Sequence, residues 1–271
     1  MLRTEMRNPN TMHLDTMNSL QIAEVMNEEN ANSVAAVEMV LPQVAAGIDA
    51  ITEAFAQGGR LIYVGAGTSG RLAVVDAAEC PPTFGAPREQ VVGIIAGGMK
   101  TMIHASENIE DDPEEGIREL QALQLQAKDV VVGISASGGA AYICNAVTYA
   151  RDLGCVTIGI TSNPGSKLTQ VAQIAISPDT GPEVLTGSTR LKAGNAQKMI
   201  LNMLSTGAMV RSGHVYENLM INLKPTNIKL RQRVIRIVSQ ITDLPEAEAE
   251  ALLEQGNWVI RDALQIWKNG G

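Results

Sequence analysis

Hydroxyl-bearing residues stand in a glycine-rich stretch, GAGTSG at 65–70, between four apolar residues and a run that favours a helix. In a strand, loop and helix of this kind the first backbone N–H groups of the helix point at a ligand. The partial positive charge at that helix end favours an anion. Gly67 contributes to the tight loop, and Thr68 and Ser69 add hydroxyl donors. The stretch therefore predicts an anion site.

The same arrangement of small and hydroxyl residues recurs twice further along the chain. Ser137 and Gly138 follow one apolar run, while Ser188 and Thr189 precede a long helical pattern that begins with Lys192. Any one of these loops could be a turn that simply needs small residues. Together they favour a ligand with one phosphate and a ring of sugar hydroxyls, and Lys192 and Arg190 are cations that could neutralise the phosphate.

A dinucleotide is a weaker interpretation of the same glycines. Gly65, Gly67 and Gly70 match the letters of the G-x-G-x-x-G pattern. That pattern also needs an acidic residue at the end of the second strand, about 20 residues on. The second apolar run instead continues into Ala96, Gly97 and Gly98, so a phosphosugar is preferred.

The elements that would position these loops are short apolar strands alternating with helices. This alternation predicts an α/β fold with a doubly wound, mostly parallel sheet. Ligands of such sheets bind at the carboxyl ends of the strands. Three of the predicted strands end in loops of small and hydroxyl residues, at 65–70, 133–139 and 159–166, so these loops should converge on one rim. The predicted strands are Leu61–Val64, Val91–Ala96, Val130–Ile134, Val156–Ile160 and Ile174–Ser177.

Helical segments flank this region on both sides. An apolar stripe from Val34 to Phe55, interrupted by Pro42, predicts N-terminal helices that pack on the core or on a partner subunit. A helix over 227–241 and two shorter helices around Gly256 predict a small C-terminal helical module. The expected domains are residues 1–56 (a polar arm at 1–17, then helices), 57–222 and 223–271.

Composition limits the partners of the chain. With 271 residues, a net charge of −8 and a pI near 5.0, it has no basic surplus for binding nucleic acid or an anionic membrane. The N-terminal residues show no signal-peptide pattern, and no apolar run reaches the length of a membrane span. Three cysteines without zinc spacing favour reduced thiols, and the expected location is the cytoplasm.

Several long and unusual stretches carry a family resemblance. They include TEMRNPNTMHLD at 4–15, VMNEEN at 25–30, GGRLIYVGAGTSGRL at 58–72, DAAECPPTFG at 76–85 and GPEVLTGSTRLKAGNAQKMILNMLSTGAM at 181–209. On these words the chain resembles the sugar isomerase (SIS) domain proteins, and closely the N-acetylmuramic acid 6-phosphate etherases. The resemblance spans residues 4 to about 229. The fold and motifs also occur in a glucokinase-regulating protein that binds phosphosugars without catalysis.

The resemblance implies a carbon–oxygen lyase that uses no metal or redox cofactor. Such an enzyme splits the D-lactyl ether of N-acetylmuramic acid 6-phosphate with water, giving N-acetylglucosamine 6-phosphate and D-lactate. The sugar ring opens, the proton alpha to the C1 aldehyde leaves C2, lactate leaves C3, and water then adds. The partner is a phosphorylated amino sugar, the role is in cell-wall (peptidoglycan) sugar recycling, and the assembly is a homodimer.

Two carboxylates fall at the catalytic positions of that family. Glu79 matches the proton donor and Glu110 the second catalytic glutamate, with the division of proton steps left open. Pro81 predicts that the helix ends near Glu79, where the partial negative charge would favour a protonated carboxyl. Glu79 is ten residues beyond Ser69, about 15 Å along a helix. That separation favours action on a ligand held by another subunit.

Alternatives to the etherase remain at this stage. SIS isomerases have a catalytic glutamate near the position of Glu183. Here Glu183 is given a binding or positioning role, whereas an aldose–ketose isomerase would use it as the base. The family usually reads ASGRTPY where this chain has ASGGAAY at 136–142. Each donor lost with the Arg and Thr is worth roughly 1.5–3 kcal/mol, so a non-catalytic phosphosugar-binding regulator is a second alternative.

Overall fold

The computed structural model describes residues 2–104, 109–222, 225 and 227–270. The chain forms two compact units. One consists of the residues up to Ala78 together with Glu89–Ala208, and the other of Glu79–Arg88 together with the residues from Met209 onward. The second unit thus begins before the predicted module at 223–271 and also includes a short segment from the middle of the chain.

A five-stranded parallel sheet forms the centre of the first unit, with strand order β2-β1-β3-β4-β5. The predicted parallel, doubly wound α/β fold is therefore confirmed. Tight glycine loops and apolar runs define the strands almost as expected, with β2 and β5 ending one residue earlier. The strands are β1 (Leu61–Gly65), β2 (Val91–Ile95), β3 (Val130–Ile134), β4 (Val156–Ile160) and β5 (Ile174–Ile176).

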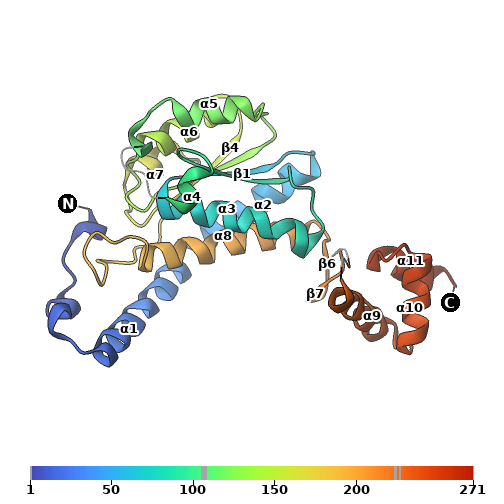
Figure 1. Cartoon of the computed structure of the whole chain (residues 1–271). Helices are drawn as coiled ribbons and strands as arrows, with labels where there is room; N and C mark the ends of the chain where they lie inside the picture. Colours follow the sequence, from blue (N-terminus) through green and yellow to red (C-terminus); the bar gives the residue numbers. More distant parts are fainter. Residues whose placement is uncertain (1, 105–108, 223–224, 226, 271) are drawn as a thin grey trace. The chain divides into compact units, whose positions relative to one another are not determined.

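Helices cover both faces of this sheet (Figure 1). On one face, residues of α5, α6 and α7 pack with Ile62, Val64 and Val131 in the main apolar cluster. On the other face lie α2, α3 and α8, where Gly47 of α2 allows close contact with Ile158 and Leu204. The helices between and after the strands are α3 (Gly67–Phe84), α4 (Lys100–Ile103), α5 (Glu115–Ala122), α6 (Ala141–Asp152), α7 (Lys167–Val171) and α8 (Lys192–Arg211), with the short η4 at Ile109–Asp111.

The N-terminal part has the predicted arm followed by two helices. Three single turns, η1 (Arg3–Glu5), η2 (Pro9–Thr11) and η3 (Leu14–Thr16), precede α1 (Ser19–Glu38) and α2 (Leu41–Ala56). Asn18 begins α1 through a capping box with Gln21. Pro42 lies in the first turn of α2, where a proline is tolerated, so the break expected there is confirmed.

In the described part of the chain no single helix meets both the length and the hydropathy needed to cross a bilayer. The pair α1 and α2 would meet them together by length and composition, but the two helices are bent by 60° at their junction.

The second unit contains a β-hairpin and three helices around an apolar core that includes Val234, Val238 and Leu253. Arg231 of α9 stacks over the ring of Trp258 at 4.7 Å. Glu217, in the hairpin turn, has a φ of 51°, a conformation that favours glycine. The elements are β6 (Val215–Tyr216), β7 (Leu219–Met220), α9 (Ile228–Thr242), α10 (Glu246–Gln255) and α11 (Ile260–Gly270).

Candidate functional site

The order of the strands in the sheet indicates where a ligand would bind. β1 pairs with β3 on one side and with β2 on the other. The chain therefore leaves the end of β1 toward one face of the sheet and the end of β3 toward the other. Ligands of open α/β sheets bind in the crevice formed at such a switch point. Gly65 and Ile134, the last residues of the two strands, are paired in register, so the loops after them begin side by side.

Glycines allow the loop after β1 to turn tightly into α3. A Cβ at Gly65 would lie 2.8 Å from the amide nitrogen of Gly70, and a Cβ at Gly70 would lie 2.7 Å from the carbonyl oxygen of Gly65. Neither approach is possible for a residue with a side chain. Gly67 begins α3 with a φ of +52° and open space beside it. The first amides of α3 have no partner within the helix and face this rim.

The two hydroxyls at the start of α3 have different roles. Ser69 is buried, and its Oγ donates to Oε1 of Gln197 on α8 at 2.9 Å. Thr68 is half-buried and stands next to the beginning of α8, because its Cγ2 lies 3.6 Å from the Cβ position of Gly194. An anion at this point would therefore meet the backbone amides and the Thr68 hydroxyl, while Ser69 connects the two helices.

The loop after β3 is held by its own serines. The Oγ of Ser135 accepts from the Gly138 amide at 3.1 Å and lies 3.3 Å from the Oγ of Ser137. Gly138 has a φ of +69°, and a Cβ there would lie 2.1 Å from Ser166 Oγ. Ser137 is half-buried at the rim. Ala140, at the N-cap of α6, makes no side-chain capping hydrogen bond.

The loop after β4 joins this loop directly. The Ser162 amide and the Asn163 side chain both donate to the carbonyl oxygen of Ala136, at 3.1 and 2.8 Å. The predicted convergence of the loops at one rim is therefore confirmed for these segments.

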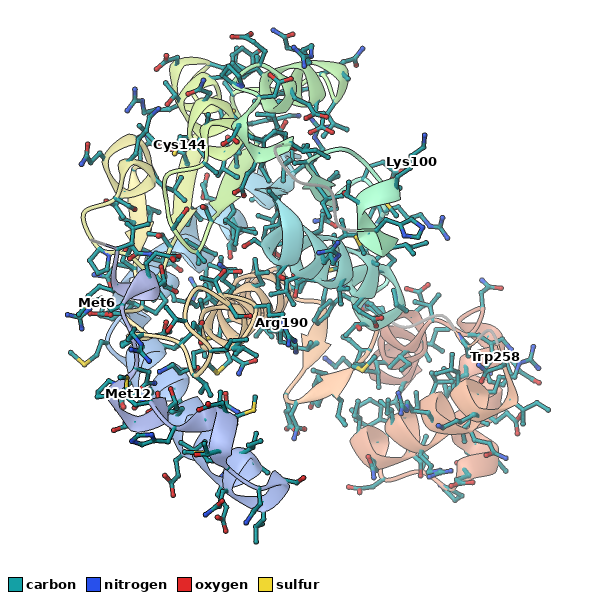
Figure 2. All side chains as sticks on the ribbon, turned by 60° about the vertical axis from the view of Figure 1, so that its left-hand side comes forward. Met6, Met12, Lys100, Cys144, Arg190 and Trp258 are labelled. Carbon is teal, nitrogen blue, oxygen red and sulfur yellow. The ribbon has the colours of Figure 1, made fainter. Side chains whose placement is uncertain are left out.

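The segment at 185–191, here called the hydroxyl turn, closes the rim from the side of α8. Ser188 and Thr189 are half-buried, and the Gly194 amide donates to the Thr189 carbonyl oxygen at 3.0 Å. The Cβ position of Gly194 lies 3.6 Å from both that oxygen and Thr68 Cγ2, so Thr189 and Thr68 are near neighbours. Arg190, labelled in Figure 2, is exposed on the same turn.

Glu183 is completely buried and caps α8. Its two carboxylate oxygens accept from the amides of Lys192 and Ala193, at 2.9 and 3.0 Å. Burial raises the pKa of Glu183 above its ordinary value, although these amides and the charge of Lys192 favour the carboxylate. Its oxygens are engaged by protein, so the geometry agrees with a positioning role.

Lys192, expected to meet the substrate phosphate, instead directs its ammonium into the protein. It is 1% exposed, and its Nζ forms an ion pair with Oε2 of Glu29 on α1. Burial by itself would raise the pKa of Glu29. Hydrogen bonds from Lys192, Asn10 and Asn8 and the Lys192 charge outweigh burial and hold that pKa below its ordinary value. Glu29 is thus a carboxylate at neutral pH.

Glu110 is exposed on η4, at the edge of the sheet where β2 ends. The neighbouring Ile109 packs on Gly97, since a Cβ at Gly97 would lie 2.6 Å from Ile109 Cδ1. Gly97 follows β2, which is next to β1, so Ile109 lies beside the carboxyl end of β2, and Glu110 is the next residue in the chain.

Glu79 differs from the expectation about its helix. α3 continues through Pro81 and Pro82 to Phe84, so it does not end at Glu79. The buried side chains of Cys80 and Phe84 on this last part of the helix offset the backbone hydrogen bonds that the prolines remove. The helix-end argument for a proton donor at Glu79 is therefore wrong. Glu79 is exposed and belongs to the second unit.

Three polar residues near the rim were not found from the sequence: Asn8, Glu29 and Gln197. Each is at least nine-tenths buried and bonded to a predicted site residue or its partner. Asn8 and Glu29 lie in the stretches TEMRNPN and VMNEEN, which carried the family resemblance but gave no chemical reason for these side chains. A buried glutamate on a mostly exposed helix has no signal in hydrophobic periodicity.

The fold is that of a SIS-domain protein. A family model described as "SIS domain" matches residues 98–207, and one described as "Glucokinase regulatory protein N-terminal SIS domain" matches residues 43–151. Over 269 residues the chain is 52% identical to N-acetylmuramic acid 6-phosphate etherases of Yersinia pestis and Yersinia pseudotuberculosis, covering 99% of this chain and 91% of theirs. The chain belongs to the N-acetylmuramic acid 6-phosphate etherase family.

Solved structures with the same fold are more distant in sequence. A putative phosphosugar isomerase involved in capsule formation from Bacteroides fragilis is 24% identical with a TM-score of 0.55, covering 72% of this chain and 94% of that one. A phosphoheptose isomerase from Francisella tularensis is 20% identical with a TM-score of 0.53, covering 71% and 98%. These likenesses support the fold.

Proposed function

We propose that this protein cleaves the D-lactyl ether of N-acetylmuramic acid 6-phosphate, giving N-acetylglucosamine 6-phosphate and D-lactate. The observation that carries the proposal is the 52% identity over 99% of the chain to curated etherases. The rim agrees with it, since the first amides of α3, which have no acceptor within the helix, stand beside the partly exposed hydroxyls that a phosphosugar requires.

The phosphate would bind to the amides of Gly67, Thr68 and Ser69 and to the Thr68 hydroxyl. Ser137, Ser188 and Thr189, all half-buried at the rim, would hydrogen-bond the sugar. Gly138 would allow the loop after β3 to approach the ligand closely. Glu183 and Lys192 would shape this surface from behind, because their charged groups are engaged within the protein.

The chemistry would use two carboxyl groups. A carboxylate removes the C2 proton of the open-chain sugar, the C3–O bond breaks, and a carboxylic acid protonates the departing lactate oxygen. Water then adds to C3, and the proton returns to C2. Glu79 and Glu110 are proposed for these steps. Every proton removed in these steps is returned, and no electrons are gained or lost. Acidic and basic side chains are therefore enough, and the proposal requires no cofactor.

A homodimer would complete the site. Ser69 and Glu79 lie on one uninterrupted helix, about 15 Å apart along its axis, so they are poorly placed for one small ligand. Apolar side chains suited to a partner are exposed on α1, α2 and between them: Val34 at 61%, Leu41 at 43% and Met39 at 79%. We therefore propose that Glu79 acts on a sugar bound by the partner subunit. The proposed location of the enzyme is the cytoplasm, and its proposed role is in peptidoglycan recycling.

The reaction is tested by incubating the protein with N-acetylmuramic acid 6-phosphate and measuring D-lactate. The unphosphorylated sugar is the matched control and should release far less. In D₂O the N-acetylglucosamine 6-phosphate formed should carry deuterium at C2, whereas direct displacement at C3 would leave C2 unlabelled. Absence of lactate, with phosphosugar binding retained, would instead identify a binding regulator, and a ketose product would identify an isomerase.

The shared site has its own test. A Glu79→Ala chain and a Thr68→Glu chain, in which a carboxylate occupies the proposed phosphate site, should each be inactive. Mixed dimers should recover activity, because one of the two sites then has an intact rim and an intact Glu79. If mixed dimers form and remain as inactive as the parents, Glu79 does not act across the dimer.

A further inference from the structure

The hydroxyl turn depends on the rest of the protein for its position. Its residues 185–187 are exposed, and its internal hydrogen bonds are short-range turn contacts such as Ser188 N to Leu185 O at 2.9 Å. Hydrogen bonds to other segments hold the turn at its two ends. At the α8 end, Glu183 holds the amides of Lys192 and Ala193. At the other end, Thr11 Oγ1 donates to the carbonyl oxygen of Val184 at 2.8 Å.

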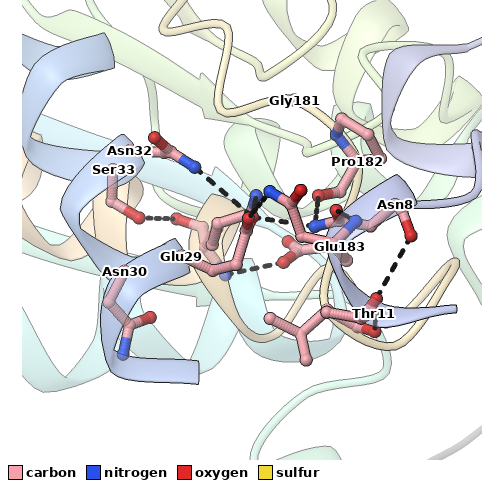
Figure 3. Close-up of polar contacts among 12 residues, drawn as sticks. Asn8, Thr11, Glu29, Asn30, Asn32, Ser33, Gly181, Pro182 and Glu183 are labelled. Carbon is pink, nitrogen blue, oxygen red and sulfur yellow. Dashed lines mark hydrogen bonds and ion pairs between the residues drawn. The ribbon is translucent and has the colours of Figure 1, made fainter. Parts of the chain in front are cut away.

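The N-terminal arm, residues 2–17, contacts both ends of this turn. Figure 3 shows Asn8 of the arm beside Glu29 of α1 and Pro182. The Nδ2 of Asn8 donates to Glu29 Oε2 at 2.8 Å and to the Pro182 carbonyl oxygen at 3.2 Å. Glu29 in turn pairs with the buried ammonium of Lys192, the first residue of α8. One asparagine thus joins the arm, α1, the segment before the turn and the helix after it.

Further contacts fasten the arm along the same edge of the sheet. Thr4 is fully buried, and its Oγ1 accepts from the side chain of Asn163 in the loop after β4. The Arg3 amide donates to the Oδ1 of Asn163, while the Arg3 side chain pairs with Asp179. The arm therefore contacts the loops after β4 and β5 as well as the hydroxyl turn.

The chemistry of this contact points to positioning rather than to stability. Burying an ion pair is costly, and well-packed apolar residues of similar size are often at least as stabilising. Here Glu29 is 4% exposed and also accepts from Asn10 and Asn32, so several polar groups are buried to define one arrangement. Such a network fixes geometry at the beginning of α8.

We propose that the arm positions the hydroxyl turn for phosphosugar binding through the contact of Asn8, Glu29 and Lys192. Asn8 and Glu29 are then positioning residues, which act on the ligand through Ser188 and Thr189. This inference rests on the proposed function and concerns the same site. By reciprocity, a ligand at the turn must stabilise the docked arm by the factor by which the arm improves ligand binding.

The first test is Asn8→Asp, which replaces a donor by a carboxylate of the same shape facing Glu29 and a carbonyl oxygen. KM for N-acetylmuramic acid 6-phosphate should rise about tenfold or more, while kcat changes much less. The matched control is Asn30→Ala, which removes an exposed α1–α8 contact to Asn195 at 3.0 Å. A second control is Asp129→Asn, which breaks the ion pair of the buried Asp129 with Arg60. These residues precede β3 and β1, so the pair lies at the amino ends of the strands, away from the rim. Both controls should keep the wild-type KM.

The second test needs no variant. Trypsin should cut the wild-type arm after the exposed Arg7 only when the arm opens. Saturating N-acetylglucosamine 6-phosphate should slow that cut about fivefold or more, and cleavage after Arg211 in the second unit should change less.

The results of these experiments distinguish the positioning role of the arm from the proposed etherase function. A wild-type KM in Asn8→Asp, or an equal rise in Asp129→Asn, overturns the positioning role. If Asn8→Asp does not fold, the protease result decides, and arm cleavage unaffected by bound product overturns it. A wild-type protein that releases no lactate overturns the proposed function, and the inference falls with it.

Discussion

Two adjacent glycines in the loop after β3 should respond very differently to the same substitution. Gly138 has a φ of +69°, and a Cβ there would lie 2.1 Å from Ser166 Oγ, 2.6 Å from Ser166 Cβ and 2.6 Å from Thr161 Oγ1. Gly139 has no atom within 4 Å of its Cβ position and no positive φ. Gly138→Ala and Gly139→Ala therefore form a matched pair.

The expected loss for Gly138→Ala has two parts. The left-handed conformation costs a residue with a Cβ about 1–2 kcal/mol, and overpacking costs about 1–3 kcal/mol. Rotation of the Ser166 hydroxyl cannot relieve the contact with its Cβ, so the loop must shift. We expect the free energy of unfolding to fall by about 2–5 kcal/mol in Gly138→Ala. In Gly139→Ala it should instead rise by about 0.4–1 kcal/mol, because alanine restricts the unfolded chain without a clash in the folded one.

Urea unfolding at neutral pH measures the change in the free energy of unfolding, and the kinetics of lactate release measure the change in KM. Movement of the loop displaces Ser137, so KM should rise about tenfold, which corresponds to about 1.4 kcal/mol of binding. The reasoning fails if both alanine variants unfold at the same urea concentration and share the wild-type KM, because the backbone at Gly138 would then tolerate a side chain.

Three further predictions follow from local structure. Ala140→Thr should add the missing cap of α6 and raise the free energy of unfolding by about 1 kcal/mol, measured with urea; an unchanged urea midpoint would mean that the hydroxyl does not reach the helix amides. Glu217→Gly should remove left-handed strain in the hairpin and raise the melting temperature, with a gain of about 1 kcal/mol, and a lower melting temperature would contradict it. Stability should fall with acid below about pH 4.5, because the pKa values of Glu29 and Asp129 are held below their ordinary values in the folded protein and this contribution is lost as pH falls through them. Asp129→Asn should flatten part of that acid decline, whereas an identical slope in wild type and variant would exclude Asp129 as a source.

Local patterns in the sequence were sufficient to predict the strands of the sheet and the loops at its rim. The strands are short apolar runs, with a glycine in the last two positions of β1, β3 and β4, and all five begin at the predicted residues. The break at Pro42 followed from proline's missing N–H. Parallel strands place all their carboxyl ends at one edge, so the convergence of the loops needed no knowledge of packing.

Other features depended on contacts between distant residues. The end of α3 was misplaced because Pro81 ordinarily stops a helix, whereas buried Cys80 and Phe84 sustain this one. Lys192 looked like a phosphate ligand because a cation near a hydroxyl turn is typical of one. Its partner, Glu29, is 163 residues away in the chain and could not be paired with it from spacing.

The alternation of strands and helices, the glycines that allow tight loops and the family could all be recognised from the amino-acid order alone. Each of these features depends on residues close together in the sequence, because local backbone conformation and short-range periodicity determine it. Which polar groups face a ligand and which are used within the protein depends on the folded arrangement of distant segments. Burial and long-range hydrogen bonds govern that choice, because a side chain can bind a ligand only if no closer partner already holds it.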